Sequence, residues 1–190
     1  HGRTVARVDE GESAAAVGPS PRVGAELTRL LGRAQAVLVC DYGQGLTGLE
    51  SIRALLGEAA RCVPVVWDPH PRGHEPVPWV ELVTPNADEA RVMSGVPGSD
   101  LAAVVAQSRC LAMAWQAKGV VVTRGAAGAV MAPRTGTPLV VPVPEPVDGD
   151  SCGAGDAFAV GATLALGAGA DPTQAVRAGV QRSVGFLRDG

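Results

Sequence analysis

Short runs of valine-rich residues alternate along this chain with longer stretches in which alanine and leucine recur at helical spacing. Because short continuous apolar runs are typical of buried strands, the pattern predicts strands at 36–40, 63–68, 80–84 and 119–123. The longer stretches predict helices at 49–61, 101–118, 154–167 and 172–188. Strands that alternate with helices in this way form a mostly parallel sheet with helices on both faces. We therefore predict an α/β fold with three layers, α/β/α.

Local signals suggest where some of these elements begin and end. Asn86 is predicted to cap a helix after the strand at 80–84, and Ser99 or Asp100 to cap the helix that begins at Leu101. The segment PLVVPVP, residues 138–144, contains three prolines, which cannot donate hydrogen bonds within a sheet. We therefore expect an extended segment there, at an edge of the sheet.

The composition narrows the class of protein. A chain of 190 residues with 46% hydrophobic residues can bury one substantial core. A net charge of −3 without a basic run argues against nucleic acid as a main partner. Apolar stretches of membrane-spanning length and a signal-peptide pattern are both absent, so we expect a soluble cytoplasmic protein without a membrane partner. The four cysteines are widely spaced and form no C-x-x-C, which predicts reduced, packed thiols.

In parallel α/β sheets, ligands bind at the carboxyl ends of the strands, so the residues that follow the predicted strands are the candidate site. One such segment, GQGLTG at 43–48, matches the dinucleotide-binding pattern G-x-G-x-x-G, and Asp68 follows Gly48 by 20 residues. However, Asp41 and Tyr42 separate the strand from the first glycine, and a carboxylate beside a pyrophosphate costs Coulomb energy. A loop without a ligand is the simpler interpretation, and NAD(P) binding is the less favoured alternative.

The segment DGDSCGAGDAF, residues 148–158, places small residues and carboxylates side by side. Gly153, Ala154 and Gly155 open a predicted helix, whose first amides lack intrahelical partners and can bind an anion. Asp156 would lie in the first turn, where the helix dipole favours its ionised form. It could then take a proton from a hydroxyl that attacks a phosphoryl group held by those amides. The alternative is a tight loop followed by an ordinary first-turn acid.

Two other strand ends carry weaker signals. Asn86 and Glu89 lie three residues apart at a predicted helix start, where their oxygen atoms could serve Mg²⁺ or its waters. The same pair also fits a capping box. The segment VVVTRGAAG, residues 120–128, offers a hydroxyl, a cation and glycines after a strand, which suits either a nucleotide phosphate or a plain turn.

Taken together and in this order, these motifs resemble the PfkB, or ribokinase-like, family of sugar kinases, with its N-x-x-E, T-x-G and D-T-x-G-A-G-D patterns. The resemblance covers roughly residues 36–188 and departs in the last motif at Ser151 and Cys152, where threonine is usual. It implies a ribokinase-like fold and ATP-dependent phosphoryl transfer to a hydroxyl of a sugar or sugar phosphate. ATP and Mg²⁺ are the implied cofactors, with K⁺ as the candidate monovalent cation.

The resemblance also implies a role for each motif residue. Asp156 would be the catalytic base, and the anion hole would comprise Gly153, Ala154 and Gly155. Glu89 would serve Mg²⁺ through water, and Asp150 would belong to a monovalent-cation site. The residues that would contact the nucleotide are Asn86, Thr123, Gly125 and Gly128.

Within the family, CDYGQG (40–45) and WDPH (67–70) look most like the heptose-phosphate kinases of the ADP-heptose pathway, which carry D-Y-x-K-G and D-P-K. Gln44 and His70 replace both lysines here and remove two positive charges, for which Arg72 and a partly protonated His70 could compensate. The substrate-contacting residues that the resemblance implies are Asp41, Gln44, Asp68, His70 and Arg72.

The N-terminal segment adds an expectation about the extent of the fold. Residues 1–12 are interpreted as the remnant of the small β lid of the family, in front of a kinase core at 13–190. From the resemblance we expect that most of the family's N-terminal portion, which supplies much of the sugar pocket, is not included in this sequence. An inactive homologue that binds a nucleotide or a partner therefore stays open as an alternative to a kinase, and a homodimer is the candidate assembly.

Overall fold

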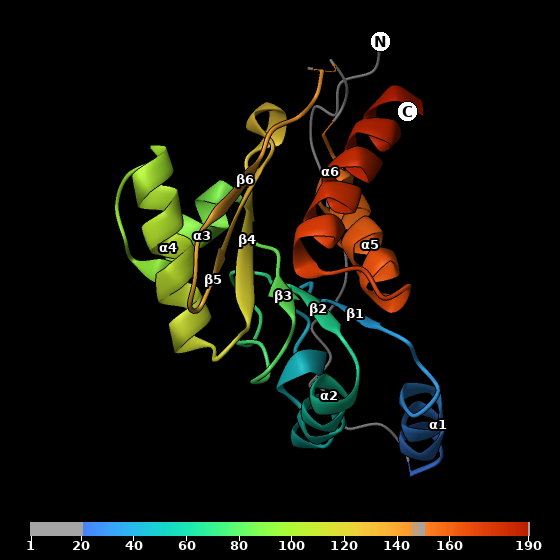
Figure 1. Cartoon of the computed structure of the whole chain (residues 1–190). Helices are drawn as coiled ribbons and strands as arrows, with labels where there is room; N and C mark the ends of the chain where they lie inside the picture. Colours follow the sequence, from blue (N-terminus) through green and yellow to red (C-terminus); the bar gives the residue numbers. More distant parts are fainter. Residues whose placement is uncertain (1–20, 146, 148–150, 190) are drawn as a thin grey trace.

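The computed structural model describes residues 21–145, 147 and 151–189, and a six-stranded sheet forms the centre of that part (Figure 1). The spatial order of the strands follows the chain, and β1 to β4 run parallel. β5 and β6 are each antiparallel to the preceding strand. The strands are β1 (Val37–Cys40), β2 (Val65–Asp68), β3 (Leu82–Val83), β4 (Gly119–Thr123), β5 (Ala129–Pro133) and β6 (Leu139–Val141).

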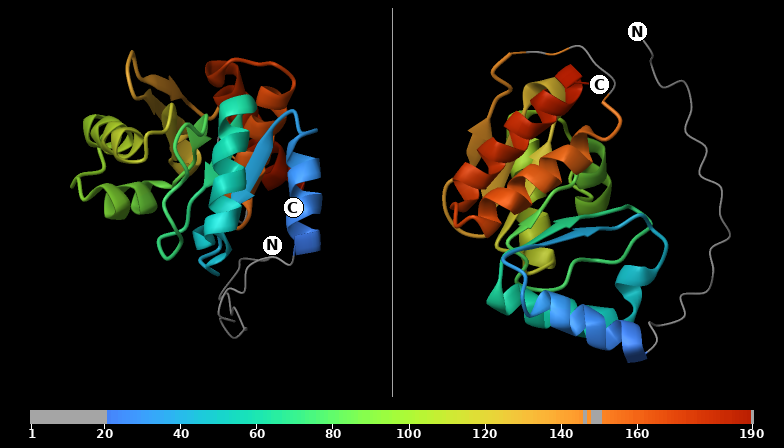
Figure 2. Two further views of the ribbon diagram at one scale, coloured as in Figure 1. Left: turned by 90° about the horizontal axis from the view of Figure 1, so that it is seen from below. Right: turned by 90° about the vertical axis from the view of Figure 1, so that its right-hand side faces the viewer.

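Helices cover both faces of the sheet, so the predicted three-layer α/β fold is confirmed (Figures 1 and 2). One face carries α2 (Glu50–Cys62), α3 (Ala87–Ser94) and α4 (Leu101–Ala114). The other carries α5 (Ala154–Gly167) and α6 (Pro172–Asp189), which lie side by side. α1 (Pro21–Leu31) packs two leucines against the α2 side, and two short 3₁₀ helices, η1 (Leu46–Gly48) and η2 (Gly125–Ala127), lie in loops.

The alternation of side chains along the strands divides the core into two clusters. Successive residues of a strand point to opposite faces of a sheet. Trp67 and Val83 therefore pack under α2, α3 and α4, whereas Val66, Leu82 and Val121 pack under α5 and α6. The same alternation decides which polar residues at the strand ends face α5.

Two predicted elements are shorter in the structure, and one observed helix was not predicted. α4 ends at Ala114 instead of reaching Lys118, because Gln116 takes a left-handed φ of 52° and turns the chain toward β4. β3 comprises only Leu82–Val83, and α1 was not predicted. The proline-rich segment does form the edge strand β6, as expected.

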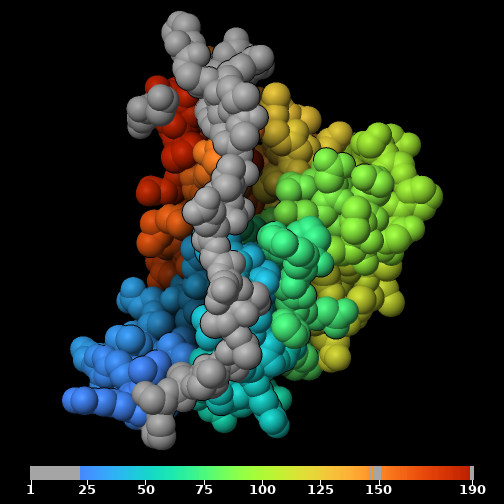
Figure 3. All heavy atoms as spheres, turned by 180° about the vertical axis from the view of Figure 1, so that it is seen from behind, coloured from blue at the N-terminus to red at the C-terminus, as the bar shows by residue number. Residues whose placement is uncertain are grey.

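Different helices lie at the two ends of the molecule. α1 and the α3–α4 pair lie at opposite ends in the space-filling view (Figure 3). Within the described ranges, no helix is long and apolar enough to cross a membrane.

Candidate active site at the carboxyl ends of the strands

The structure brings together most of the predicted strand-end residues near the start of α5. Because β1 to β4 are parallel, their carboxyl ends lie at one edge of the sheet, and α5 begins there. Gly153, the N-cap of α5, has a φ of 88°, and its missing side chain leaves room for the ring of Phe186. Glycine is favoured at this position because a left-handed φ strains other residues.

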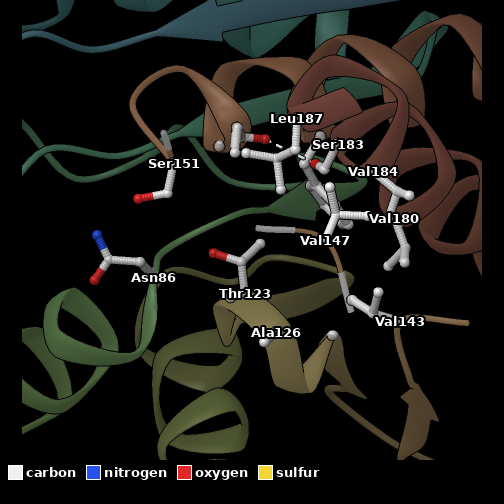
Figure 4. Close-up of a pocket in the computed structure, with 15 residues that line it drawn as sticks. Asn86, Thr123, Ala126, Val143, Val147, Ser151, Val180, Ser183, Val184 and Leu187 are labelled. Carbon is white, nitrogen blue, oxygen red and sulfur yellow. Dashed lines mark hydrogen bonds between the residues drawn. The ribbon is translucent and has the colours of Figure 1, made fainter. Parts of the chain in front are cut away.

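A cavity of about 390 Å³ opens between the start of α5, helix α6 and the β4–β5 hairpin. Figure 4 shows its polar side chains, Asn86, Ser151 and Thr123, on one side, and the apolar side chains of α6 opposite. Ser183 of α6 donates a hydrogen bond of 2.7 Å to the carbonyl of Ala154, which fixes α6 against the first turn of α5. We call this cavity the α5–α6 pocket. Its lining comprises Asn86, Thr123, Gly125, Ala126, Gly128, Val143, Val147, Ser151, Ala154, Gly155, Phe158, Val180, Ser183, Val184 and Leu187.

All four residues predicted to contact a nucleotide line this pocket. Thr123 ends β4, and the Gly125 carbonyl accepts a hydrogen bond from the Gly128 amide at 2.9 Å, which closes the hairpin. Gly128 has a φ of 82°, and a side chain there would collide with the carbonyl oxygen of Val141. The glycine thus lets β6 approach the hairpin closely.

Asn86 and Glu89 form the capping box that the sequence offered as an alternative to metal binding. The Asn86 Oδ1 accepts hydrogen bonds of 3.0 Å from the amides of Asp88 and Glu89. The Glu89 Oε2 accepts one of 2.8 Å from the Asn86 amide. The box places the Asn86 side chain at the polar side of the pocket, so capping and ligand contact are compatible, and the metal role of Glu89 stays a prediction.

Asp156 lies on the other side of the first α5 turn, beside the ends of β1 and β2. One ligand atom each of Cys40, Asp68 and Asp156 lies within 4.8 Å of the other two. Burial, followed by the charges of Asp156 and Glu89, raises the pKa of Asp68 to about 6, against the opposing hydrogen bond from Thr84. Burial and the same two aspartates also raise the pKa of the Cys40 thiol. The cluster therefore contains several acidic groups, and ionisation of all of them at once is unfavourable.

Sequence reasoning missed several members of this site. Cys40 was not singled out, and Thr84 was considered only as one of several residues at a strand end, although the period of two along a strand places both on the α5 face. Tyr42 also belongs to the surroundings of Asp156, whose charge is the largest cause that raises the tyrosine pKa. The apolar wall from α6 carried no motif and could have been found only from helix periodicity.

Asp41, predicted to contact substrate, holds two loops together. Its carboxylate accepts hydrogen bonds from the Gly43 amide at 2.8 Å, the Thr47 hydroxyl at 2.6 Å and the His74 amide at 3.1 Å. A side chain at Gly73 would collide with this carboxylate. Asp41 is buried and satisfied by these donors, so it organises the loops.

The other predicted substrate residues lie on the two loops that Asp41 joins. His70 is partly buried, and its Nδ1 accepts a hydrogen bond of 3.1 Å from the Arg72 amide. Gln44 and Arg72 are exposed. A side chain at Gly43 would approach His70 Nδ1 to 2.8 Å, so the loops are in close contact.

The same loop argues against the NAD(P) alternative. The Gly43 amide, which would face a pyrophosphate, already donates to Asp41, and the chain forms η1 before α2 begins at Glu50. In the dinucleotide-binding pattern a long helix starts directly at the glycines. Here it does not. We therefore abandon this interpretation.

The remaining predictions concern Asp150, residues 1–12 and the cysteines. Asp150 and the proposed lid remnant at 1–12 lie outside the described residues. Within the part of the chain that the structure describes, the cysteines form no disulfide, but Cys62, Cys110 and Cys152 are exposed, so the expectation that they are packed was wrong for these three. Cys62 and Cys110 belong to surface helices, where the apolar neighbours in sequence face the core and the cysteine does not.

Comparisons with known proteins agree with the geometry. Residues 34–183 match the pfkB family of carbohydrate kinases. The bifunctional protein HldE of Streptomyces coelicolor is 44% identical over 163 residues, which cover 84% of this chain and 34% of that protein. HldE of Caulobacter vibrioides is 35% identical over 165 residues, covering 83% and 34%. The chain thus spans about a third of the length of these relatives.

Solved structures agree on the fold. Escherichia coli phosphofructokinase-2 in complex with fructose-6-phosphate has a TM-score of 0.68 at 22% identity, over 90% of this chain and 58% of that one. Arabidopsis thaliana ribokinase, complexed with ribose and ATP, has a TM-score of 0.68 at 18% identity, over 90% and 54%. At these identities the likeness shows the fold alone. With the family match over most of the chain, it follows that this chain belongs to the pfkB family of carbohydrate kinases.

Proposed function

We propose that this chain is the nucleotide-binding and base-carrying part of a kinase that transfers a phosphoryl group from ATP to a hydroxyl of a sugar or sugar phosphate. One observation carries the proposal: a single helix turn separates a nucleotide-sized cavity from a carboxylate that forms no salt bridge within the described residues. Ala154 and Gly155 line the α5–α6 pocket, and Asp156 in the same turn lies beside Cys40 and Asp68. A donor in the pocket and an acceptor hydroxyl beside Asp156 would meet at the start of α5.

The pocket suits a nucleoside triphosphate. Its apolar side, formed by Val180, Val184 and Leu187, could hold a purine base, because burial of an aromatic ring on apolar side chains is favourable. Its polar side reaches the N-terminal end of α5, where the helix dipole and the free amides of the first turn favour phosphate.

Metal ions would add charge neutralisation at the polar side. A carboxylate oxygen suits Mg²⁺ and its waters, and Glu89 stands beside Asn86 at the edge of the pocket. One oxygen of Glu89 maintains the capping box, and the other is proposed to take a metal-bound water. Asp150 is proposed to belong to a site for K⁺ by family resemblance.

Catalysis would rest on positioning and proton transfer. Asp156 would accept the proton of the attacking hydroxyl, while the first-turn amides of α5 stabilise the charge that develops on the phosphoryl oxygens. Phosphoryl transfer requires mainly alignment and charge neutralisation from the protein, which a rigid helix start can supply.

The acceptor would lie over the loops that Asp41 holds. Gln44, His70 and Arg72 share this side, and the resemblance to heptose-phosphate kinases makes a heptose or heptose phosphate the candidate acceptor. Arg72 is exposed and could bind a phosphate on that substrate. A homodimer and a cytoplasmic location stay predictions.

The test replaces the base. Asp156→Asn keeps the size of the side chain and removes the proton acceptor, so turnover should fall by about 10² to 10⁴. Nucleotide affinity should hold, because Asp156 does not line the pocket. Asp88→Asn is the matched control, since Asp88 is also an exposed first-turn acid but belongs to α3 and not to the cluster of Cys40, Asp68 and Asp156.

Single-turnover transfer from saturating ATP to a panel of hexoses, heptoses and their phosphates gives the measurement. Undiminished turnover in Asp156→Asn would remove Asp156 from the mechanism. ATP binding without transfer to any acceptor would instead favour the inactive, nucleotide-binding homologue.

A further inference from the structure

Three neighbouring strands direct a polar side chain at the same point on α5. Cys40, Asp68 and Thr84 each stand two residues after a core residue of the α5–α6 face, namely Leu38, Val66 and Leu82. Because side chains alternate along a strand, the three must point to that face. Cys40 and Asp68 are also direct partners in the β1–β2 register. The backbone thus fixes Asp68 beneath Asp156.

Asp68 is held in place from one side only. The Thr84 hydroxyl donates a hydrogen bond of 2.7 Å to the Asp68 Oδ1, and the Asp68 carboxylate lies within 4.8 Å of a carboxylate oxygen of Asp156. Among residues 21–145, 147 and 151–189, neither aspartate forms a salt bridge. Two carboxyl groups therefore share a site without a cation from the described chain.

The groups around Asp68 are acidic or neutral on every element packed against it. Cys40 comes from β1, Tyr42 from the loop that follows, Glu89 from α3 and Asp156 from α5. Burial and the charges of Asp156 and Glu89 raise the pKa of Asp68 to about 6, and the bond from Thr84 opposes the rise. Asp68 therefore changes its charge within the range of pH at which enzymes are assayed.

We propose that Asp68 is a positioning residue for Asp156, and that its negative charge strengthens Asp156 as a proton acceptor. The inference rests on the proposed role of Asp156 as base. An ionised Asp68 repels a second negative charge nearby, so it favours uptake of a proton by Asp156. When Asp68 is protonated at lower pH, that support is lost. The fall of turnover at low pH, the acid limb of the pH profile, would then follow the protonation of Asp68.

Two variants should move the pH profile of turnover in opposite directions. Asp68→Asn keeps an acceptor for Thr84 but removes the charge, so turnover at pH 8 should fall roughly three- to tenfold and the limb near pH 6 should disappear. Thr84→Val removes the bond that favours ionised Asp68, so the limb should move to higher pH. Asp88→Asn should leave the profile unchanged.

A second readout needs no turnover. Carboxyl carbon NMR of aspartate-labelled protein, with signals assigned through Asp68→Asn and Asp156→Asn, follows each titration directly. In Asp156→Asn the Asp68 signal should titrate at lower pH than in the wild type, because the charge of Asp156 helps to raise the pKa of Asp68. In Thr84→Val the Asp68 signal should titrate at higher pH.

The outcomes separate this inference from the proposed function. An Asp68 titration that Asp156→Asn leaves unchanged, or a pH profile that neither variant moves, would overturn the role of Asp68. Coupled titrations in a protein that transfers no phosphoryl group would support the carboxyl pair and overturn the kinase proposal instead.

Discussion

The carboxyl pair predicts that a single substitution stabilises the protein, and only above a certain pH. Asp68 has a pKa of about 6 in the folded chain against an ordinary value of 3.8, because the folded state buries it beside other acids. Below pH 4 it is protonated in both states and costs nothing. Between pH 4 and 6 the folded state holds the proton that the unfolded state has released, so stability falls as the pH rises. Above pH 6 the loss is complete.

The size of this loss follows from the two pKa values. One pKa unit corresponds to about 1.4 kcal/mol, so ionisation of Asp68 costs the folded state about 3 kcal/mol at most. Asp68→Asn replaces the carboxylate with a neutral group of the same size that can still accept from Thr84. We expect this variant to gain about 1 to 3 kcal/mol above pH 7, which corresponds to a rise in Tm of several degrees for a chain of this length.

Urea unfolding at pH 4, 5, 6 and 7.5 measures the effect. The excess in the free energy of unfolding of Asp68→Asn over the wild type should be smallest at pH 4 and grow progressively to pH 7.5. Asp88→Asn controls for loss of an exposed acid. If the difference in the free energy of unfolding is the same at every pH, ionisation of Asp68 does not destabilise the folded state. A variant that is less stable than the wild type at pH 7.5 would refute the reasoning.

Two further substitutions test the pocket. Glu89→Gln should raise the Mg²⁺ concentration needed for half-maximal turnover. The free energy of unfolding should change little, since glutamine still completes a capping box with Asn86. A loss of about 1 kcal/mol in the free energy of unfolding, with unchanged Mg²⁺ dependence, would mean that Glu89 only caps α3. Gly128→Ala should lower stability by roughly 2 kcal/mol or more, because its φ of 82° and the Val141 carbonyl exclude a side chain. Gly57→Ala, in an open position on α2, should be neutral or stabilising in the same thermal melts, and equal Tm values for the two alanine variants would contradict this account.

The sequence predicted the elements whose patterns are local and periodic. The valine runs that became β2 and β4 are buried on both faces, and the residues of β1 pack partly buried against both core clusters, so their continuous apolar character is sufficient to identify them. The end of α4 was missed because Gln116 adopts a left-handed φ, which has no signal in an ordinary polar residue. α1 is amphipathic, but it packs only two side chains, those of Leu27 and Leu31, against the described hydrophobic core, and both are partly buried.

The candidate site was predictable wherever a residue type is tied to backbone chemistry. The glycines before Asp156 and the Asn86–Glu89 spacing gave usable signals because helix starts have known requirements. Cys40 and Thr84 gave none, since each looks like the last residue of an apolar strand. Only the register of β1, β2 and β3 shows that they flank Asp68. Asp41 was placed correctly at a strand end, but sequence could not show that three internal donors occupy it.

Asp41 and Asp68 stand at equivalent places in sequence, at or just after a strand end, and the structure gives them opposite electrostatics. Asp41 is buried with three donors from its own loops, so its charge is satisfied and the loops are fixed. Asp68 points to the other face, where one hydroxyl donates to it and the neighbouring groups are acids. A protein gains no stability from an arrangement like that of Asp68, because burial of a charge among like charges is unfavourable. Such sites persist where function requires them, so the strain at Asp68 is itself an argument that the chemistry of this fold lies beside Asp156.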